Sequence, residues 1–393
     1  MYFALWMALM TPPGNDVLEK IKAAVVANIL RLPNYTCTET IERSYRRSVS
    51  RSFENIDRVR LEIGYVDGKE LFGWPGGEKL AEENLGRLIR GTISNGDFAL
   101  IARAVFAGRN VAFGEVRQED HNGRAALRGD FTAPQDGSDW LLSAGGRRFP
   151  VGYHGSFWAD PATLELLEVQ LIAEKLPPEL GYASITRSLQ FQRLHVGAGD
   201  FVLPSRAVLF TTEATGAESI NETRFHNCRQ YSAESTLLFD QEAPPDNPPA
   251  MTSKPVASLP DEFVVVLALD KPIDSDVAAV GDPIAAIVEQ NIRTKGDIAV
   301  PKGAVLHGRI TGLPVIDGHR CLELAFIDFD TAGRRMEISQ RRNELVILNR
   351  RIAGFDDSRI RAQSPYPIQA PGNRLILPRG YQFQLKSTAA AKP

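Results

Sequence analysis

The stretch that decides the fold is VRLEIGYVDGKELFGW, residues 59–74. In its first half, Val59, Leu61 and Ile63 alternate with charged residues. Alternation with a period of two is typical of a strand that is buried on one face. Asp67-Gly68 follows, a dipeptide that favours a tight hairpin turn, and a second apolar run begins after it. The stretch therefore predicts an antiparallel ribbon with one buried face.

Similar short runs, separated by turn residues such as Asn122-Gly123, recur on both sides of this ribbon. They predict strands from Cys37 onward and at 111–117, 124–131, 140–144, 149–158, 167–171, 189–192, 201–204 and 208–210. The last part of the chain repeats the pattern at 263–269, 304–310, 322–326, 345–348 and 381–385. Most of the chain is therefore expected to be antiparallel β structure.

Three segments have helical spacing instead. Residues 16–32 place apolar side chains on one stripe, Asn28 is the one polar residue near that stripe, and Pro33 ends the helix because proline lacks an amide hydrogen. Two shorter helices are predicted at 80–89 and 97–106, and Asp97 is the expected N-cap of the latter.

Composition limits the class of protein. The chain has 393 residues, 43% of them hydrophobic and 24% charged, which is typical of a globular protein with two or three domains. The formal net charge is −3, so the basic excess of a nucleic-acid-binding protein is missing. Residues 241–258 are rich in proline and poor in large apolar side chains, which predicts an extended linker.

These observations predict an α+β fold, mostly antiparallel β. One domain is expected at 16–240 and a second at 259–393, where the repeated units of a turn and a strand predict a small closed β-barrel or a sandwich. Residues 1–10 form an apolar run that is too short to span a bilayer and has the length of a signal-peptide core. Residues 1–15 are interpreted as a degenerate signal segment, with an apolar tail that packs on the domain as the alternative.

The chain has three cysteines, which is too few for a disulfide scaffold. Cys37 begins the first strand-like run and Cys228 lies near the end of the first domain. If the two segments pair as neighbouring strands, a Cys37–Cys228 disulfide ties both ends of that domain together, which requires an exported protein. Two buried free thiols are the alternative, and Cys321 is expected to be a buried free thiol.

No catalytic, metal or cofactor site is predicted. His154, Ser156 and Asp160 lie close in sequence, but His154 and Ser156 sit at successive positions on one face of a strand, and no nucleophile-elbow motif surrounds the serine. A hydrolase that uses these three residues is kept as a third hypothesis. The six histidines are scattered, and the chain has no P-loop or dinucleotide-binding glycine motif.

Large apolar side chains in the strands and short helices could line an apolar cavity, with ordinary sheet core as the alternative. The candidate ligand-binding residues are Trp74, Leu85, Ile101, Trp140, Phe157 and Trp158.

The order of elements over 16–239 resembles that of the outer-membrane lipoprotein carrier family, which has the LolA/LolB-like fold. Residues 155–164 (GSFWADPATL) resemble the strand–turn–strand hairpin of that family, and 189–191 and 201–204 resemble its closing strands. The resemblance implies an open curved sheet, or half-barrel, with a few short helices at 16–240, and an apolar concavity that accepts acyl chains. The second domain resembles the TrbI-like barrel of type IV secretion scaffolds at 279–283 and 300–308, which favours a small β-barrel domain at 259–393 as the second part of the chain.

The leading hypothesis is an exported, non-enzymatic protein of the periplasm or cell envelope that binds a lipid or a lipidated partner. Envelope proteins are its expected partners, and it is not expected to be an integral membrane protein. The alternative is a structural or assembly module of an envelope or secretion complex that has no small ligand.

Overall fold

The computed structural model describes residues 14–77, 80–81, 89, 91–94, 96–144, 146–231, 258–331, 334–348, 361–363 and 366–389. The chain divides into two compact units. Unit 1 comprises Met1–Asn55, Leu61–Gly73 and Glu78–Ser232, and unit 2 comprises Ile56–Arg60, Trp74–Gly77 and Ala233–Pro393. The predicted linker at 241–258 and the predicted signal segment at 1–15 lie almost wholly outside the described residues.

Within the described residues, the first part of the chain is built from one large antiparallel sheet, a small two-stranded sheet and two helices. Its elements are α1 (Gly14–Arg31), β1 (Tyr35–Arg46), β2 (Glu54–Val66), β3 (Lys69–Gly73), α3 (Leu100–Ala107), β4 (Ala112–Phe113), β5 (Arg117–His121), β6 (Arg124–Ala133), β7 (Leu141–Ala144), β8 (Arg147–Pro150), β9 (Gly152–Ala159), β10 (Leu166–Glu174), the 3₁₀ turn η1 (Pro178–Leu180), β11 (Tyr182–Val196), β12 (Gly199–Glu213) and β13 (Glu218–Gln230).

The sheet has the order β3-β2-β1-β13-β12-β11-β10-β9-β6-β4, with β5 paired to β6. Most neighbours follow one another in the chain, but β13 inserts between β1 and β12, so the last strand of the unit lies beside the first. The predicted turn at Asp67-Gly68 joins β2 to β3, and both residues have positive φ, of 51° and 81°. A hairpin turn with positive φ at both central residues favours the Asp-Gly dipeptide, which explains its presence here.

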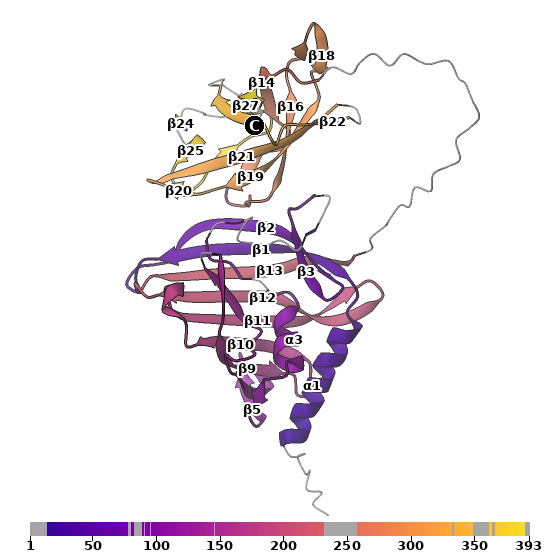
Figure 1. Cartoon of the computed structure of the whole chain (residues 1–393), viewed down its shortest axis with the longest axis vertical. Helices are drawn as coiled ribbons and strands as arrows, with labels where there is room; N and C mark the ends of the chain where they lie inside the picture. The colour runs from indigo at the N-terminus through magenta and orange to yellow at the C-terminus, as the bar shows by residue number, and fades with distance from the viewer. Residues whose placement is uncertain are drawn as a thin grey trace, which may run out of the picture. The chain divides into compact units, whose positions relative to one another are not determined.

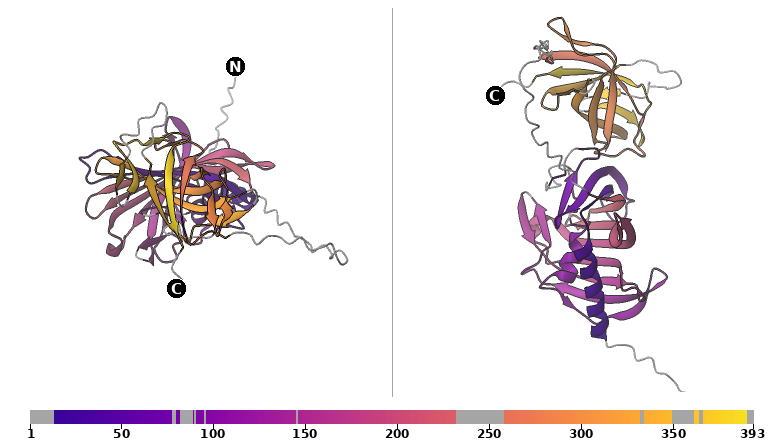
Figure 2. Two further views of the ribbon diagram at one scale, coloured as in Figure 1. Left: turned by 90° about the horizontal axis from the view of Figure 1, so that it is seen from above. Right: turned by 90° about the vertical axis from the view of Figure 1, so that its right-hand side faces the viewer.

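Both helices lie on the same face of this sheet, and α1 runs across the strands rather than along them (Figures 1 and 2). Leu18, Ile21 and Val25 of α1 are buried, as the helical spacing predicted. On α3 the buried side chains are Ile101, Ala102, Val105 and Phe106. The helices therefore cover the sheet with their apolar faces.

The long strand β12 contains a proline that marks an irregularity in the sheet. The pairing of β11 with β12 shifts between Gln190–Arg206 and Phe191–Pro204. Because proline cannot donate a backbone hydrogen bond, it is tolerated in a sheet at such a bulge. The two strands predicted at 201–204 and 208–210 are thus one strand with a bulge between them.

The last part of the chain is a second antiparallel β unit. Its elements are β14 (Glu262–Leu269), β15 (Ile273–Asp274), β16 (Pro283–Val288), β17 (Ile292–Thr294), β18 (Asp297–Val300), β19 (Val305–Gly312), β20 (Val315–Ile316), β21 (His319–Asp330), β22 (Arg335–Glu337), β23 (Arg342–Ile347), β24 (Arg361–Gln363), β25 (Tyr366–Pro371), β26 (Ile376–Leu377) and β27 (Gln382–Thr388).

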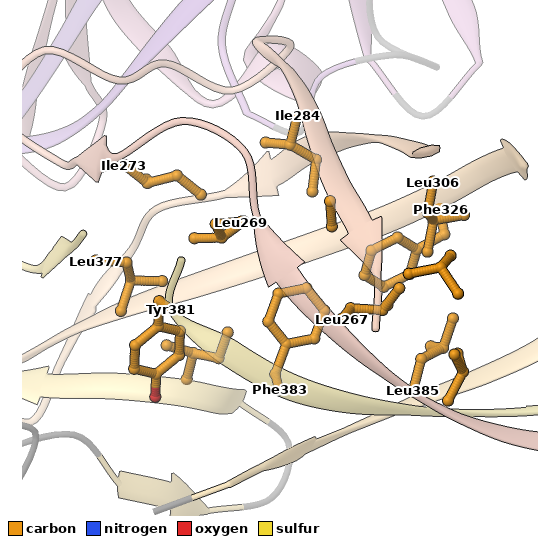
Figure 3. Packing of buried hydrophobic residues seen from close by; sticks show 14 of the residues in the cluster. Leu267, Leu269, Ile273, Ile284, Leu306, Phe326, Leu377, Tyr381, Phe383 and Leu385 are labelled. Carbon is orange, nitrogen blue, oxygen red and sulfur yellow. The ribbon is translucent and has the colours of Figure 1, made fainter. Parts of the chain in front are cut away.

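The main sheet of unit 2, ordered β23-β27-β14-β16-β19-β21-β25-β24, is a curled half-barrel. Its inner side is filled: Leu267, Leu306 and Phe383 are fully buried, and the side chains from different strands point toward one another (Figure 3). The predicted fold class, α+β with mostly antiparallel β structure, is confirmed.

The predicted helix at 80–89 lies largely outside the described residues. The other short helix, α3, differs from its prediction in its start and in its cap: it begins at Leu100 rather than at 97. Asp97 does not cap α3: the N-cap position is Ala99, which makes no side-chain capping bond. In the part of the chain that the structure describes, no helix combines the length and apolar content that crossing a bilayer requires.

Candidate functional site

A cavity of about 260 Å³ lies in unit 1 under the C-terminal half of α1. Its lining residues come from α1, the start of β1, the segment before α3, the turn between β9 and β10, and the facing parts of β11 and β12. They are Ala24, Val25, Ala27, Asn28, Ile29, Arg31, Leu32, Tyr35, Asp97, Phe98, Ala99, Ala102, Thr163, Leu164, Glu165, Leu166, Leu189, Phe191, Arg193, Asp200, Val202, Leu203 and Pro204.

The deep side of this cavity is apolar. Val25, Phe98, Leu189 and Leu203 line it and are each at least 94% buried. Phe98 is fixed among aromatic rings, because its centroid lies 4.7 Å from that of Tyr35. A pocket with such walls favours an apolar ligand, since it offers few hydrogen-bonding groups to a polar one.

The helix α1 is attached to the sheet by one polar side chain. The Asn28 amide nitrogen donates to the carbonyl oxygen of Val202 at 2.9 Å, and the Asn28 carbonyl oxygen accepts from the Val202 N–H at 3.0 Å. β13 pairs with β12 only between Arg206 and Thr212, so among the described strands none pairs with this side of Val202. Asn28 makes the hydrogen bonds that a neighbouring strand would make to Val202, and it thereby fixes α1 as one wall of the cavity.

A second wall, the segment before α3, is held by a carboxylate from β3. Glu70 accepts hydrogen bonds from the backbone N–H groups of Gly96 and Ala99, both at 2.8 Å, and from that of Leu100 at 3.3 Å. These groups stand at the start of α3, where N–H groups lack partners within the helix. Glu70 therefore performs the capping that was predicted for Asp97.

Asp97 instead forms a buried ion pair with Arg187 of β11. The Arg187 guanidinium donates to Asp97 Oδ1 from Nε at 3.1 Å and also from Nη2, and each side chain is 7% exposed. Because both ends of the pair are buried, it fixes the cavity-lining segment at 97–99 to the sheet.

A third buried acid, Glu39 of β1, lies near these groups. Its Oε2 atom has no hydrogen-bond partner among the described residues. Burial raises the pKa of Glu39 well above its ordinary value, and the charges of Asp97 and Glu70 raise it further. Burial also raises the pKa of Glu70, although its backbone hydrogen bonds oppose this shift. The interior beside the cavity thus holds three acids and favours protonation of Glu39.

The mouth of the cavity is polar. Arg31, Arg193 and Asp200 line it and are exposed. Arg193 is paired with Glu165, and Asp200 lies 2.8 Å from Nδ1 of His195. Arg31 lies over the ring of Phe201, 5.8 Å from its centroid. The site therefore has an apolar interior and a charged entrance.

Of the six ligand-binding residues predicted from the sequence, the five that the structure describes do not line this cavity. Ile101 is buried on α3 beside the lining residue Ala102. Trp140 is 8% exposed and lies under the Arg187 guanidinium, 5.5 Å from it. Trp74 follows β3 and is grouped with unit 2, and Leu85 lies outside the described residues.

Phe157 and Trp158 lie on opposite faces of β9, because successive side chains of a strand alternate. Phe157 is fully buried against Phe106, at 5.3 Å between ring centroids. The Trp158 ring stacks on His121 at 4.3 Å, and its Nε1–H donates to Glu119 at 2.7 Å. The two rings therefore do not line the same concavity.

The structure also separates the three residues of the hydrolase hypothesis. Nδ1 of His154 lies 2.7 Å from Glu174, while the Ser156 hydroxyl donates to Asp130 at 2.7 Å. Asp160 accepts hydrogen bonds from two backbone N–H groups in the turn after it. Each of the three is held by a different partner, and the serine hydroxyl donates to the Asp130 carboxylate rather than to the imidazole of His154.

The structure contains the Cys37–Cys228 disulfide, which joins β1 to the neighbouring β13 across 191 residues of sequence. Cys321 is a buried free thiol. Within the described ranges, no three His, Cys, Asp or Glu side chains form a group that could hold a metal ion.

No family model matches the chain, and no curated protein matches it. Among solved structures, the chain is similar to ComB10 of the Com type IV secretion system of Helicobacter pylori, with 12% identity and a TM-score of 0.21, over 33% of this chain and 90% of that one. It is also similar to a DUF1329 family protein from Desulfovibrio piger ATCC 29098, with 10% identity and a TM-score of 0.31, over 57% and 96%. Both matches are weak, and the resemblance to lipoprotein carriers stays a prediction.

Proposed function

We propose that this chain is an exported, non-catalytic protein of the cell envelope, and that unit 1 binds the apolar chain of a lipid or of a lipidated protein under α1. The observation that carries the proposal is the cavity of about 260 Å³ with buried aliphatic and aromatic walls. Burial of an acyl chain there would stabilise the complex by about 0.8 kcal/mol per methylene group.

The disulfide supports the location. Disulfides persist in oxidising compartments such as the bacterial periplasm and are rare in the cytosol. Cys37 and Cys228 join the first strand of unit 1 to its last, so the bond crosslinks two neighbouring strands in the middle of the sheet on which the cavity is built. A periplasmic or envelope-associated protein is the class that this arrangement favours.

The groups that contact the cavity also support a binding role rather than a catalytic one. The two acids Asp97 and Glu165, which line the cavity, are held in ion pairs, Asp97 by Arg187 and Glu165 by Arg193. The Asn28 amide is held by the Val202 backbone. None of these groups is positioned as a nucleophile beside a base.

The test is a calorimetric titration of the purified full-length protein with dodecanol. The wild type is expected to bind. Ala24→Phe places a ring into the cavity and is expected to abolish binding, because Ala24 is a lining residue. Ala23→Phe is the matched control, since Ala23 is the neighbouring residue on α1, is exposed and does not line the cavity.

If the wild type does not bind dodecanol, the proposal is rejected. The alternative, an assembly module that has no small ligand, then takes its place. Equal loss of binding in both variants would show that a ring on α1 acts through the fold rather than through the cavity. Native mass spectrometry of protein purified from its host adds an independent result, because a bound lipid appears directly as added mass.

A further inference from the structure

The charged side chains at the cavity mouth differ in whether they have an ion-pair partner. Arg193 has Glu165 as its partner, and Asp200 has His195. Among the described residues, no carboxylate lies within ion-pair distance of Arg31, and its guanidinium lies over the Phe201 ring. Arg31 is thus the cation at this mouth that an incoming anion meets without first displacing a carboxylate.

The interior fixes the direction in which an amphiphile enters. Phe98 and Leu189 are 1% exposed and Leu203 is 2% exposed, and all three line the deep side. A charged group placed beside these three side chains would lose its hydration and meet only apolar surface, which is costly. An amphiphile therefore places its chain inside and its head group at the mouth, beside Arg31 in the last turn of α1.

We propose, on the basis of the function proposed above, that the ligand is a single-chain amphiphile with an anionic head group, and that Arg31 binds this head group. The guanidinium is a planar fork of N–H donors that matches the oxygen pairs of carboxylates and phosphates. Arg31 lines the cavity and is exposed, so a head group reaches it while the chain stays buried. The chemistry that is recognised is a head-group oxyanion.

The experiment compares three ligands that share one chain: dodecanoate, dodecyl phosphate and dodecanol. They are titrated by calorimetry into the full-length protein, at a pH well above the ordinary pKa of the carboxyl group and at low salt. Both anions are expected to bind about fivefold more tightly than dodecanol, because an ion pair at an exposed rim is modest. The difference should shrink at high salt, which screens such pairs.

Arg31→Gln is expected to remove this preference, because it weakens the binding of both anions about fivefold relative to the binding of dodecanol. Arg147→Gln is the matched control, because Arg147 is also exposed over a phenylalanine ring, 4.9 Å from the centroid of Phe149, and does not line the cavity. It is expected to change none of the three affinities. Whether dodecanoate or dodecyl phosphate binds more tightly distinguishes a carboxylate from a phosphate head group.

Equal affinity of the wild type for all three ligands would overturn this inference while leaving the proposed function intact. Equal weakening of all three by Arg31→Gln would also overturn it, since the side chain would then act on the fold. If none of the three binds, the inference falls together with the proposed function.

Discussion

The Glu70 carboxylate accepts a hydrogen bond from the backbone N–H of Ala99 at 2.8 Å, across 29 residues of sequence. This contact fixes the start of α3 to the edge strand β3 of the sheet. Because Ala99 also lines the cavity, the same contact holds one cavity wall in place.

Replacement of Glu70 by alanine should destabilise unit 1. The change leaves the N–H groups of Gly96, Ala99 and Leu100 without their acceptor, and unpaired buried groups of this kind cost about 1–3 kcal/mol. Urea denaturation followed by tryptophan fluorescence measures the effect. Glu54→Ala is the control, since Glu54 is exposed at the start of β2, and a loss of the same size there would remove the specific role of Glu70.

The acid Glu39 should make the stability depend on pH. Its folded-state pKa is raised by burial first and then by Asp97 and Glu70, so the folded state holds the proton more tightly than the unfolded state does. The stability that this proton provides is complete below the unfolded-state pKa and is lost as the pH rises toward the folded-state pKa. Glu39→Gln should therefore gain stability relative to the wild type as the pH rises.

Denaturant unfolding at a series of pH values tests this sign. The difference in free energy of unfolding, variant minus wild type, should increase with pH above the ordinary glutamate pKa. A difference that stays constant, or one that falls with pH, would show that Glu39 is not held in its protonated form by the fold.

Removal of the disulfide should lower the stability of unit 1 by about 2–5 kcal/mol, because the bond closes a loop of 191 residues. The double variant Cys37→Ala/Cys228→Ala is compared with the wild type by thermal unfolding, with and without a reducing agent. Reduction should bring the wild type close to the variant and leave the variant unchanged. The prediction is contradicted if the disulfide of the wild type is fully reduced and the temperature of unfolding stays the same.

Phe157 should contribute to stability and not to ligand binding. Its ring is fully buried between Phe106 and Phe113, and it covers the backbone of Gly129, where a Cβ atom would come within 2.4 Å of the ring. Phe157→Leu should cost about 1.5 kcal/mol of stability and leave the affinity for dodecanol unchanged. Loss of affinity without loss of stability would place this ring in the ligand site after all.

The strands could be predicted from the sequence because their signals are local. Val59, Leu61 and Ile63 are all buried, as their alternation required, and Asp67-Gly68 adopts the positive φ values that select this dipeptide. The cap of α3 was not predictable in the same way. Asp97 has the right residue type and position, but its partner Arg187 lies 90 residues away, and the folded structure decides between the two roles.

The cavity could not be located from the sequence. Val25 and Leu203 line a cavity, while Val105 and Leu171 fill the core, and all four are buried apolar side chains of the same kind. A periodic pattern shows which face of an element is buried and does not show whether a void lies beside it. Asn28 is the one signal that the sequence carries, because a lone polar side chain beside an apolar stripe needs a partner inside the fold.

The most direct measurement of the central claim is photolabelling with a fatty alcohol that carries a diazirine in its chain, followed by peptide mapping of the full-length protein. The proposed site predicts labels on peptides that contain Val25, Ile29 and Leu203, and competition by dodecanol. Labels confined to peptides with Trp140 or Phe157, or to unit 2, would contradict the claim that the apolar chain binds under α1.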